Sequence, residues 1–150
     1  MTQKFSPGTV AVTPETGEIV AIHLRGEFDL ATTPCVLEEA ERRLDDHKHL
    51  ILDLNGATFI DSSVINVIVR AHRTASARGR VAVLELGPNT VVERALDISG
   101  ITRIVPRAHT RADAIDTIHR ATEPGAAEPE SQAAATQASG SRKNGVSLPS

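Results

Sequence analysis

The sequence predicts an α/β fold, in which a mostly parallel sheet of four to five strands is covered by about four helices. Two short runs, LILDL (residues 50–54) and VAVLEL (residues 81–86), are almost continuously apolar, as parallel strands buried on both faces should be. Strand and helix patterns alternate up to residue 121, which indicates crossover helices between parallel strands. Between the two apolar runs, residues recur at the spacing of one helix face: Val64, Val67, Ile68, Ala71 and Ala75.

An antiparallel hairpin is predicted at the start of this fold. Two β-branched runs, residues 9–13 and 19–26, flank the turn-forming segment PETGE. From Val20 to Arg25, larger apolar residues alternate with smaller or polar ones, so one face of this strand is expected in the core and the other at least partly in water. His23 is therefore predicted to be a structural residue on the wet face.

The later elements are bounded by capping and breaking residues. Gly87 and Pro88 are expected to begin the third helix, and the run RIVP (residues 103–106) is expected to form a short strand. Thr110 and Asp113 have capping-box spacing at the start of the last helix, with Asp in the usual place of Glu.

The chain is predicted to hold one domain. Residues 1–8 are expected to be a flexible N-terminus, and residues 9–122 are expected to form the folded domain, which is close to the commonest domain size. From residue 123 to residue 150 the chain has no aromatic residue and many helix breakers. Such a segment buries too little apolar surface to offset its ordering entropy, so it is predicted to be a disordered tail.

Composition excludes several classes of function. The net charge is −3, and three Phe are the only aromatic residues, so neither a basic surface nor stacking platforms for nucleic acid are expected. No apolar run approaches the roughly 18 residues of a membrane span, and the first residues lack a secretory signal. The single cysteine, Cys35, cannot form an internal disulfide and is expected to be a small filler in the first helix. A cytoplasmic protein is expected.

No motif for a cofactor, a metal or autonomous catalysis is found. The chain lacks both the G-x-G-x-x-G and the G-x-x-x-x-G-K-[ST] phosphate loops. His47 and His49 flank Lys48 and are expected to lie at a solvated edge. No G-x-S-x-G elbow surrounds Ser62. We therefore expect no cofactor, no metal and no enzyme, although a small α/β enzyme that uses Asp61 and Ser62 is kept as an alternative.

Asp61, Ser62 and Ser63 stand where the second predicted strand gives way to a helix. Each is a good N-cap residue, worth about 0.5–2 kcal/mol over alanine. One cap is sufficient for one helix, however. All three lie at the carboxyl end of a central strand, where open α/β sheets usually place their functional sites. The segment is therefore the predicted site, with capping as the competing explanation.

Three segments in order resemble one family. LDLNGATFIDSSVINVIVRAHR (residues 52–73) resembles the segment around the phosphorylatable serine in the STAS domain of bacterial anti-sigma factor antagonists. LRGEFD (residues 24–29) is similar to the G-E-L-D element of that family, and LDISGITRIV (residues 96–105) to a later Leu…Gly-hydrophobic…Ile element. The three segments lie within residues 9–121, and the predicted tail lies outside the resemblance.

The resemblance implies a STAS fold and a regulated protein–protein contact. In this family the unmodified antagonist binds an anti-sigma factor that is itself an ATP-dependent serine kinase, and so frees the sigma factor. Phosphorylation of the antagonist breaks the pairing. The modified serine directly follows the aspartate, which implies Ser62 here, with Ser63 as the second choice. The implied partner-binding residues are Asp29, Asp61, Ser62, Ser63, Val64, Asn66 and Arg70.

One position departs from the family pattern. Val64 stands where the family typically has glycine, and a β-branched side chain beside the serine is expected to hinder close approach of a kinase. The alternative function is therefore a STAS module that binds a small ligand or scaffolds a signalling complex without being phosphorylated. In either case no direct contact with nucleic acid or membrane is expected.

Overall fold

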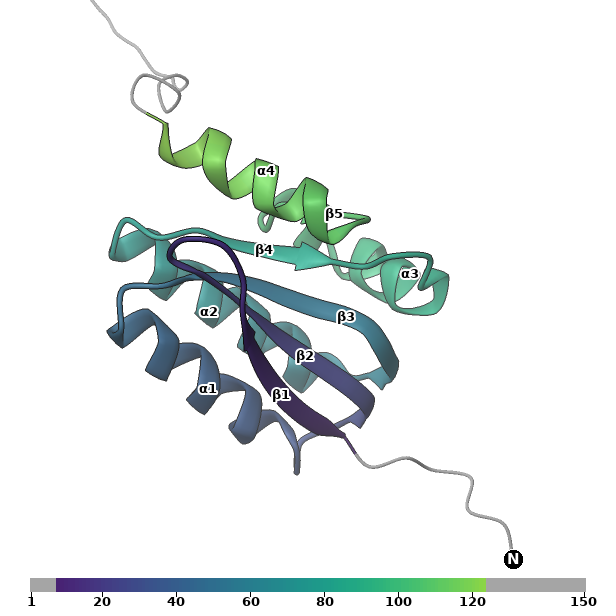
Figure 1. The fold of residues 1–150 in the computed structure, drawn as a ribbon. Helices are drawn as coiled ribbons and strands as arrows, with labels where there is room; N and C mark the ends of the chain where they lie inside the picture. The colour runs from purple at the N-terminus through teal and green to yellow at the C-terminus, as the bar shows by residue number, and fades with distance from the viewer. Residues whose placement is uncertain (1–7, 124–150) are drawn as a thin grey trace, which may run out of the picture. The chain divides into compact units, whose positions relative to one another are not determined.

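The computed structural model describes residues 8–123 of the chain (Figure 1). The chain divides into two units, residues 1–118 and 119–150. The first unit holds the whole sheet and most of the last helix, whereas only residues 119–123 of the second are described. Apart from Gly8 and Glu123, the predicted flexible N-terminus and the predicted disordered tail lie outside the described residues.

Five strands form one sheet in the order β1-β2-β3-β4-β5. β1 is antiparallel to β2, and the remaining neighbours are parallel. The predicted mostly parallel sheet with an N-terminal hairpin is therefore confirmed. The strands are β1 (Thr9–Pro14), β2 (Ile19–Phe28), β3 (His49–Ile60), β4 (Ala82–Glu85) and β5 (Arg107–Ala108).

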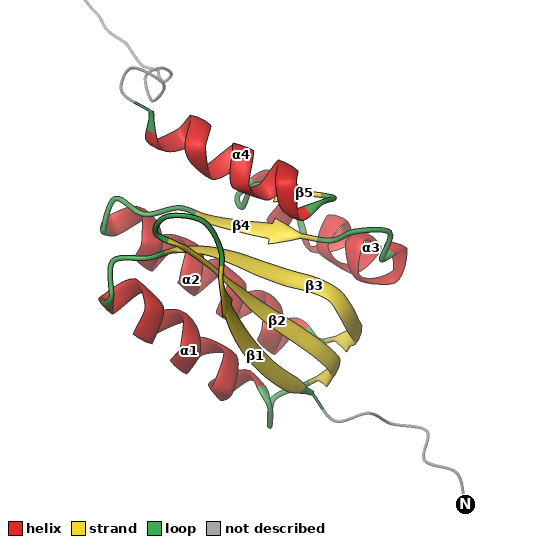
Figure 2. Cartoon of the chain, in the orientation of Figure 1, coloured by secondary structure: helices red, strands yellow, loops and turns green. Residues whose placement is uncertain are grey.

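Helices cover both faces of this sheet (Figure 2). Parallel strands that follow one another across a sheet are joined by crossovers of one hand, so the first crossover helices lie on the same face. Among the described helices, none is both long and apolar enough to cross a bilayer. The helices are α1 (Thr33–Asp45), α2 (Ser62–Ala77), α3 (Thr90–Ser99), a 3₁₀ turn (Ile101–Arg103) and α4 (Arg111–Thr122).

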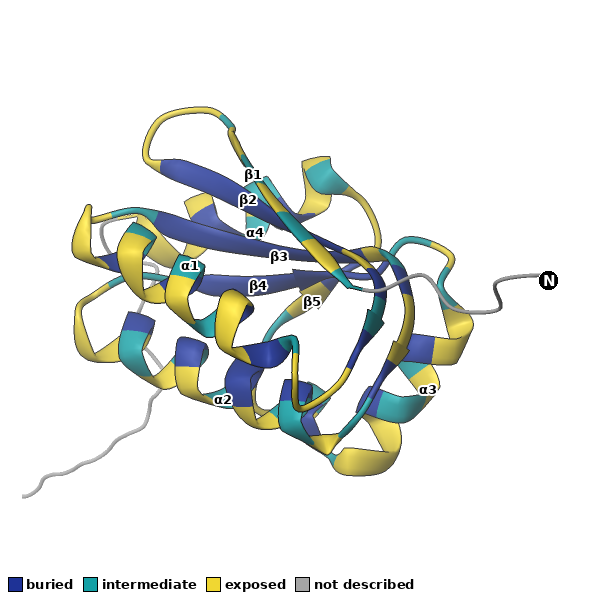
Figure 3. Ribbon diagram, turned by 90° about the horizontal axis from the view of Figure 1, so that it is seen from below, coloured by how far each residue is buried: buried dark blue, intermediate teal, exposed yellow. Residues whose placement is uncertain are grey.

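The two faces bury cores of different size. On one face, α1, α2 and α3 pack on the alternating leucines of β2, β3 and β4, such as Leu24, Leu52 and Leu84. On the other face, Ala114 and Ile118 of α4 pack on a smaller set of apolar residues. Figure 3 shows the buried strands between helices whose outer surfaces are exposed. Strands β3 and β4 are thus covered on both faces, as their apolar runs predict, and β2 is covered on both faces as well, although its alternation predicts one wet face.

Three local predictions are wrong. The residues predicted as a strand at 103–106 complete the 3₁₀ turn and a loop, and β5 begins only at Arg107. α3 starts at Thr90, later than predicted, because Asn89 provides the cap through a hydrogen bond from the Val92 N–H. Cys35 is exposed and is therefore not a core filler.

β3 carries two irregularities that bend its carboxyl half. Its register against β2 shifts between the His23 and Arg25 pairings and again between the Gly26 and Glu27 pairings. Between the two pairings on either side of each shift, β3 contains one more residue than β2. Such bulges increase the local twist and redirect the strand. They lie just before Asp61 and so set the direction in which the predicted site leaves the sheet.

Asn89 holds this bend in place from the neighbouring loop. Its side-chain amide donates hydrogen bonds to the carbonyl oxygens of Leu54 (2.9 Å) and Ala57 (2.8 Å). Its side-chain oxygen accepts the Val92 N–H (3.3 Å) at the start of α3. One side chain thus satisfies carbonyls next to the first bulge and also caps a helix, which joins α3 to the bent strand.

Asn89→Asp is expected to lower the free energy of unfolding by about 1–3 kcal/mol, because it removes both amide donors while keeping an equally good cap. Urea unfolding measures this change. Asn66→Asp makes the same chemical change at an exposed position of α2 and is expected to stay within about 0.5 kcal/mol of wild type. Equal effects of the two substitutions would show that the amide donors contribute nothing.

Candidate functional site

Asp61 is the N-cap of α2. Its backbone is extended, and its Oδ1 accepts hydrogen bonds from the N–H groups of Ser63 (2.9 Å) and Val64 (3.4 Å). The same oxygen accepts the Ser63 hydroxyl at 2.5 Å. That hydroxyl, with the two N–H groups, holds the pKa of the Asp61 carboxyl below its ordinary value. Capping therefore occupies Asp61 and engages Ser63, but it does not use Ser62.

The two serines lie in different surroundings. Ser62 is the first residue of α2 and is exposed. Within residues 8–123 its hydroxyl has no hydrogen-bond partner. Ser63 is half-buried, and its hydroxyl donates a hydrogen bond to Asp61. Of the two hydroxyls, only that of Ser62 is both open to solvent and unengaged.

Asp29 lies beside this segment because β2 and β3 end together. Phe28, the last residue of β2, pairs with Ile60, the last residue of β3. The residues that follow, Asp29 and Asp61, therefore leave the sheet at the same edge. Asp29 is exposed, and its Oδ1 accepts the Ala31 N–H at 3.0 Å. Two carboxylates thus follow paired strand ends at this edge of the sheet.

A shallow hollow adjoins the serines between the first turns of α1 and α2. Leu30, one of its lining residues, is 76% exposed. The lining residues are Leu30, Thr33, Pro34, Leu37, Ser63, Asn66, Val67 and Arg70.

The structure therefore brings together six of the seven predicted partner-binding residues. Asp29, Ser62, Asn66 and Arg70 are exposed, and Asp61 and Ser63 are half-buried beside them. Val64 differs, because its side chain is fully buried in the core. It points away from the solvent side of the helix and so cannot cover the Ser62 hydroxyl.

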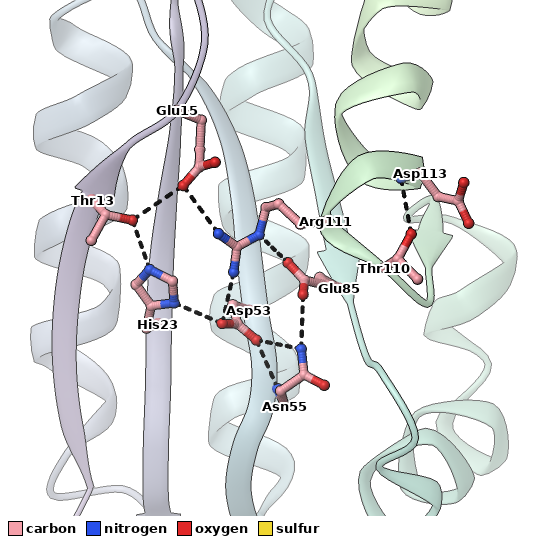
Figure 4. A network of polar contacts seen from close by, with 9 residues as sticks. All are labelled: Thr13, Glu15, His23, Asp53, Asn55, Glu85, Thr110, Arg111 and Asp113. Atoms are coloured by element: carbon pink, nitrogen blue, oxygen red, sulfur yellow. Dashed lines mark hydrogen bonds and ion pairs between the residues drawn. The ribbon is translucent and has the colours of Figure 1, made fainter.

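A second polar cluster lies on the opposite face of the sheet (Figure 4). Arg111, the first residue of α4, pairs through Nε with Glu85 of β4. Its Nη1 lies 3.0 Å from Glu15 and its Nη2 lies 3.1 Å from Asp53. Burial acts to lower the pKa of Arg111, but its bond with Glu85 and the charges of all three carboxylates raise it. The Arg111 guanidinium therefore connects α4 with the β1–β2 turn, with β3 and with β4.

His23 belongs to the same cluster, so its predicted position on a wet face is wrong. It is only 8% exposed. Its Nδ1 lies 2.6 Å from Asp53 Oδ2, and its Nε2 lies 2.8 Å from the Thr13 hydroxyl. Burial alone acts to raise the pKa of the Asp53 carboxyl, but hydrogen bonds from Asn55 and His23 outweigh it and lower this pKa.

The sequence contains a signal for this cluster. Asp53 and Glu85 are charged residues inside two otherwise apolar central strands, and a buried carboxylate needs a cation or several donors nearby. Arg111 supplies that cation from α4, which follows the last strand. Within residues 8–123, no group of three or more His, Cys, Asp or Glu side chains is arranged to hold a metal ion. The cluster fastens α4 to the sheet.

Arg111→Met is expected to cost about 3–5 kcal/mol of stability, because it leaves buried carboxylates facing one another without their cation. Chemical unfolding followed by far-UV circular dichroism measures the loss. Arg42→Met removes an arginine that is 53% exposed and paired on the surface of α1, where ion pairs contribute about 0–1 kcal/mol. A loss for Arg111 no larger than that for Arg42 contradicts this assignment.

Stability is expected to fall in acid partly through Asp53. Its pKa is lower in the folded chain than the value of about 3.9 for an unfolded aspartate. The contribution of Asp53 is therefore complete above that value and is lost as the pH falls through the folded pKa. Urea unfolding between pH 7 and pH 3 is expected to show a smaller loss for Asp53→Asn than for wild type. Asp46→Asn, at an exposed position, is the control and is expected to follow the wild-type curve.

Comparisons with known proteins identify the family of the chain. The family model of the STAS domain matches residues 11–114. The anti-sigma F factor antagonist of Paenibacillus polymyxa is 30% identical over 91 residues, which cover 59% of this chain and 76% of that protein.

Solved structures resemble the fold at low sequence identity. An anti-sigma factor antagonist from Mycobacterium paratuberculosis is 21% identical with a TM-score of 0.64, and the match covers 75% of this chain and 95% of that chain. The Bacillus cell fate determinant SpoIIAA in its phosphorylated form is 21% identical with a TM-score of 0.58, over 73% of this chain and 99% of that chain. The residues matched by the family model include β2 and β3, whose ends lead to Asp29 and to the serines, and the chain belongs to the STAS domain family.

Proposed function

We propose that this chain is an anti-sigma factor antagonist. It binds an anti-sigma factor of the serine-kinase type through the surface around Ser62, and phosphorylation of Ser62 ends the contact. The relative with 30% identity carries the name of such an antagonist. The observation that carries the proposal is the exposed, unengaged Ser62 hydroxyl at the start of α2. The chain itself acts by binding and not by catalytic turnover.

The proposed binding surface combines apolar and polar groups. Leu30 offers exposed apolar area in the hollow that Ser63 also lines. Asp29, Asn66 and Arg70 add charged and hydrogen-bonding groups. An apolar centre with a polar rim is the usual composition of a specific protein interface. Val64 does not belong to this surface, but its side chain packs in the core and so holds the first turn of α2 in position.

A phosphate at Ser62 is compatible with the fold. It adds about −1.5 to −2 charges at neutral pH at a helix N-terminus, where the helix dipole favours an anion. The same group is unfavourable in the complex, because a partner packed against this surface has to bury the charge beside Asp29 and Asp61. Each tenfold loss of affinity needs only about 1.4 kcal/mol. Dissociation therefore requires no rearrangement of the chain.

The test compares Ser62→Ala with Ser62→Glu in binding to a purified kinase-type anti-sigma factor, measured by titration calorimetry. Ser62→Ala is expected to bind like wild type, because the hydroxyl is not needed for the contact. Ser62→Glu is expected to bind about 100-fold more weakly, because an unpaired interfacial charge costs about 2–5 kcal/mol.

Ser76→Glu is the control, since Ser76 is an exposed serine in the last turn of the same helix. It is expected to bind like wild type. Equal binding by the two glutamate variants would refute Ser62 as the switch. Loss of binding by Ser62→Ala would instead show that the hydroxyl itself forms the contact.

A further inference from the structure

Two hydroxyls lie one residue apart at the start of α2, and a kinase that reaches one is close to the other. Ser62 is exposed and unengaged within the described residues. Ser63 donates its hydroxyl to Asp61 at 2.5 Å and lines the hollow with Leu30 and Leu37. The two serines therefore differ in hydrogen bonding and in burial.

We propose that Asp61 determines which serine is phosphorylated. It holds the Ser63 hydroxyl in a hydrogen bond, so that the phosphoryl group is transferred to Ser62. This inference rests on the proposed function, because it concerns the same kinase and the same segment. Asp61 is thus a specificity-determining residue in addition to its role as the helix cap. It acts through Ser63 and does not have to touch the nucleotide.

Phosphoryl transfer from ATP needs a serine hydroxyl that is free to attack, so the two serines are expected to react differently. The serine Oγ attacks the γ-phosphorus of ATP, a new O–P bond forms, and the bond to the oxygen that bridges to the β-phosphorus breaks. ADP leaves, and the serine proton passes to a base of the kinase. Ser62 enters this reaction directly, whereas Ser63 first has to give up its bond to Asp61 and leave the hollow.

Asp61 is fixed where it holds Ser63. Its Oδ1 also accepts the N–H groups of Ser63 and Val64, so rotating the carboxylate away would uncap the helix. The bond from the Ser63 hydroxyl is also the largest cause that lowers the pKa of Asp61, so the carboxylate stays charged while it holds that hydroxyl. A phosphate on Ser63 would also lie against the Asp61 carboxylate, and like charges repel.

The first experiment uses a purified kinase-type anti-sigma factor with Mg²⁺ and ATP, and locates the phosphate by tandem mass spectrometry. Wild type is expected to carry at least about tenfold more phosphate on Ser62 than on Ser63, the effect of one hydrogen bond to a charged group. In Asp61→Ala this ratio is expected to fall towards one. Asp61→Asn keeps a capping oxygen but no charge and is expected to give an intermediate ratio.

Ser62→Ala gives the sharpest readout, because only Ser63 remains. This variant is expected to stay almost unlabelled, whereas Ser62→Ala combined with Asp61→Ala is expected to label Ser63 about tenfold faster or more. The control pairs Ser62→Ala with Asp46→Asn, which removes an exposed negative charge at the far end of α1 without touching the Ser63 bond. That pair is expected to leave Ser63 as unreactive as in Ser62→Ala alone. Equal labelling of Ser63 with and without Asp61 would overturn the inference.

A second measurement needs no kinase. The Ser63 hydroxyl proton is expected to exchange slowly with water and to be visible by NMR, and Asp61→Ala is expected to abolish that signal. A Ser63 hydroxyl that exchanges as fast as that of Ser62 would overturn the inference whatever the kinase does. Absence of phosphate from both serines of wild type, with the Ser63 signal present, would instead refute the phosphorylation step of the proposed function.

Discussion

The parallel pairing of β2 with β3 is the constraint on which the site depends. The two strands end opposite each other at Phe28 and Ile60, so the loops that follow leave the sheet at one edge. Strand pairing alone, without contact between the loops, therefore places Asp29 near Asp61. The bulges in β3 and the amide of Asn89 then fix the direction in which α2 starts. The position of the serines is thus a property of the sheet.

The two faces of the sheet are stabilised by different means. The face under α1 and α2 is a large apolar core that supports the proposed binding surface. The face under α4 has a small apolar core and a buried ionic cluster around Arg111. The cluster therefore adds three charged contacts to the apolar contact that holds α4 against the sheet. The proposed contact surface and the ionic cluster therefore occupy opposite sides of one rigid layer.

Periodicity in the sequence predicts the elements, but it does not identify which helix covers which strand. The stripe from Val64 to Ala75 and the apolar runs of β3 and β4 specify their elements locally, and the structure confirms them. His23 was predicted on a wet face because alternation distinguishes two faces without revealing that α4 and the hairpin enclose the second one. The prediction of a strand at 103–106 is wrong because a local apolar run does not show whether its residues are buried. Ile104 is 52% exposed and does not pack in the sheet.

The burial of Val64 affects the proposed contact between α2 and an anti-sigma factor. A glycine at this position loses more backbone freedom on folding and leaves the first turn softer, whereas a β-branched side chain locked in the core keeps that turn stiff. A stiff turn presents its surface already in the bound shape, so less conformational entropy is lost on association. Preorganisation of this kind favours long-lived complexes, and it would make the lifetime of the proposed complex depend on a side chain that no partner can touch.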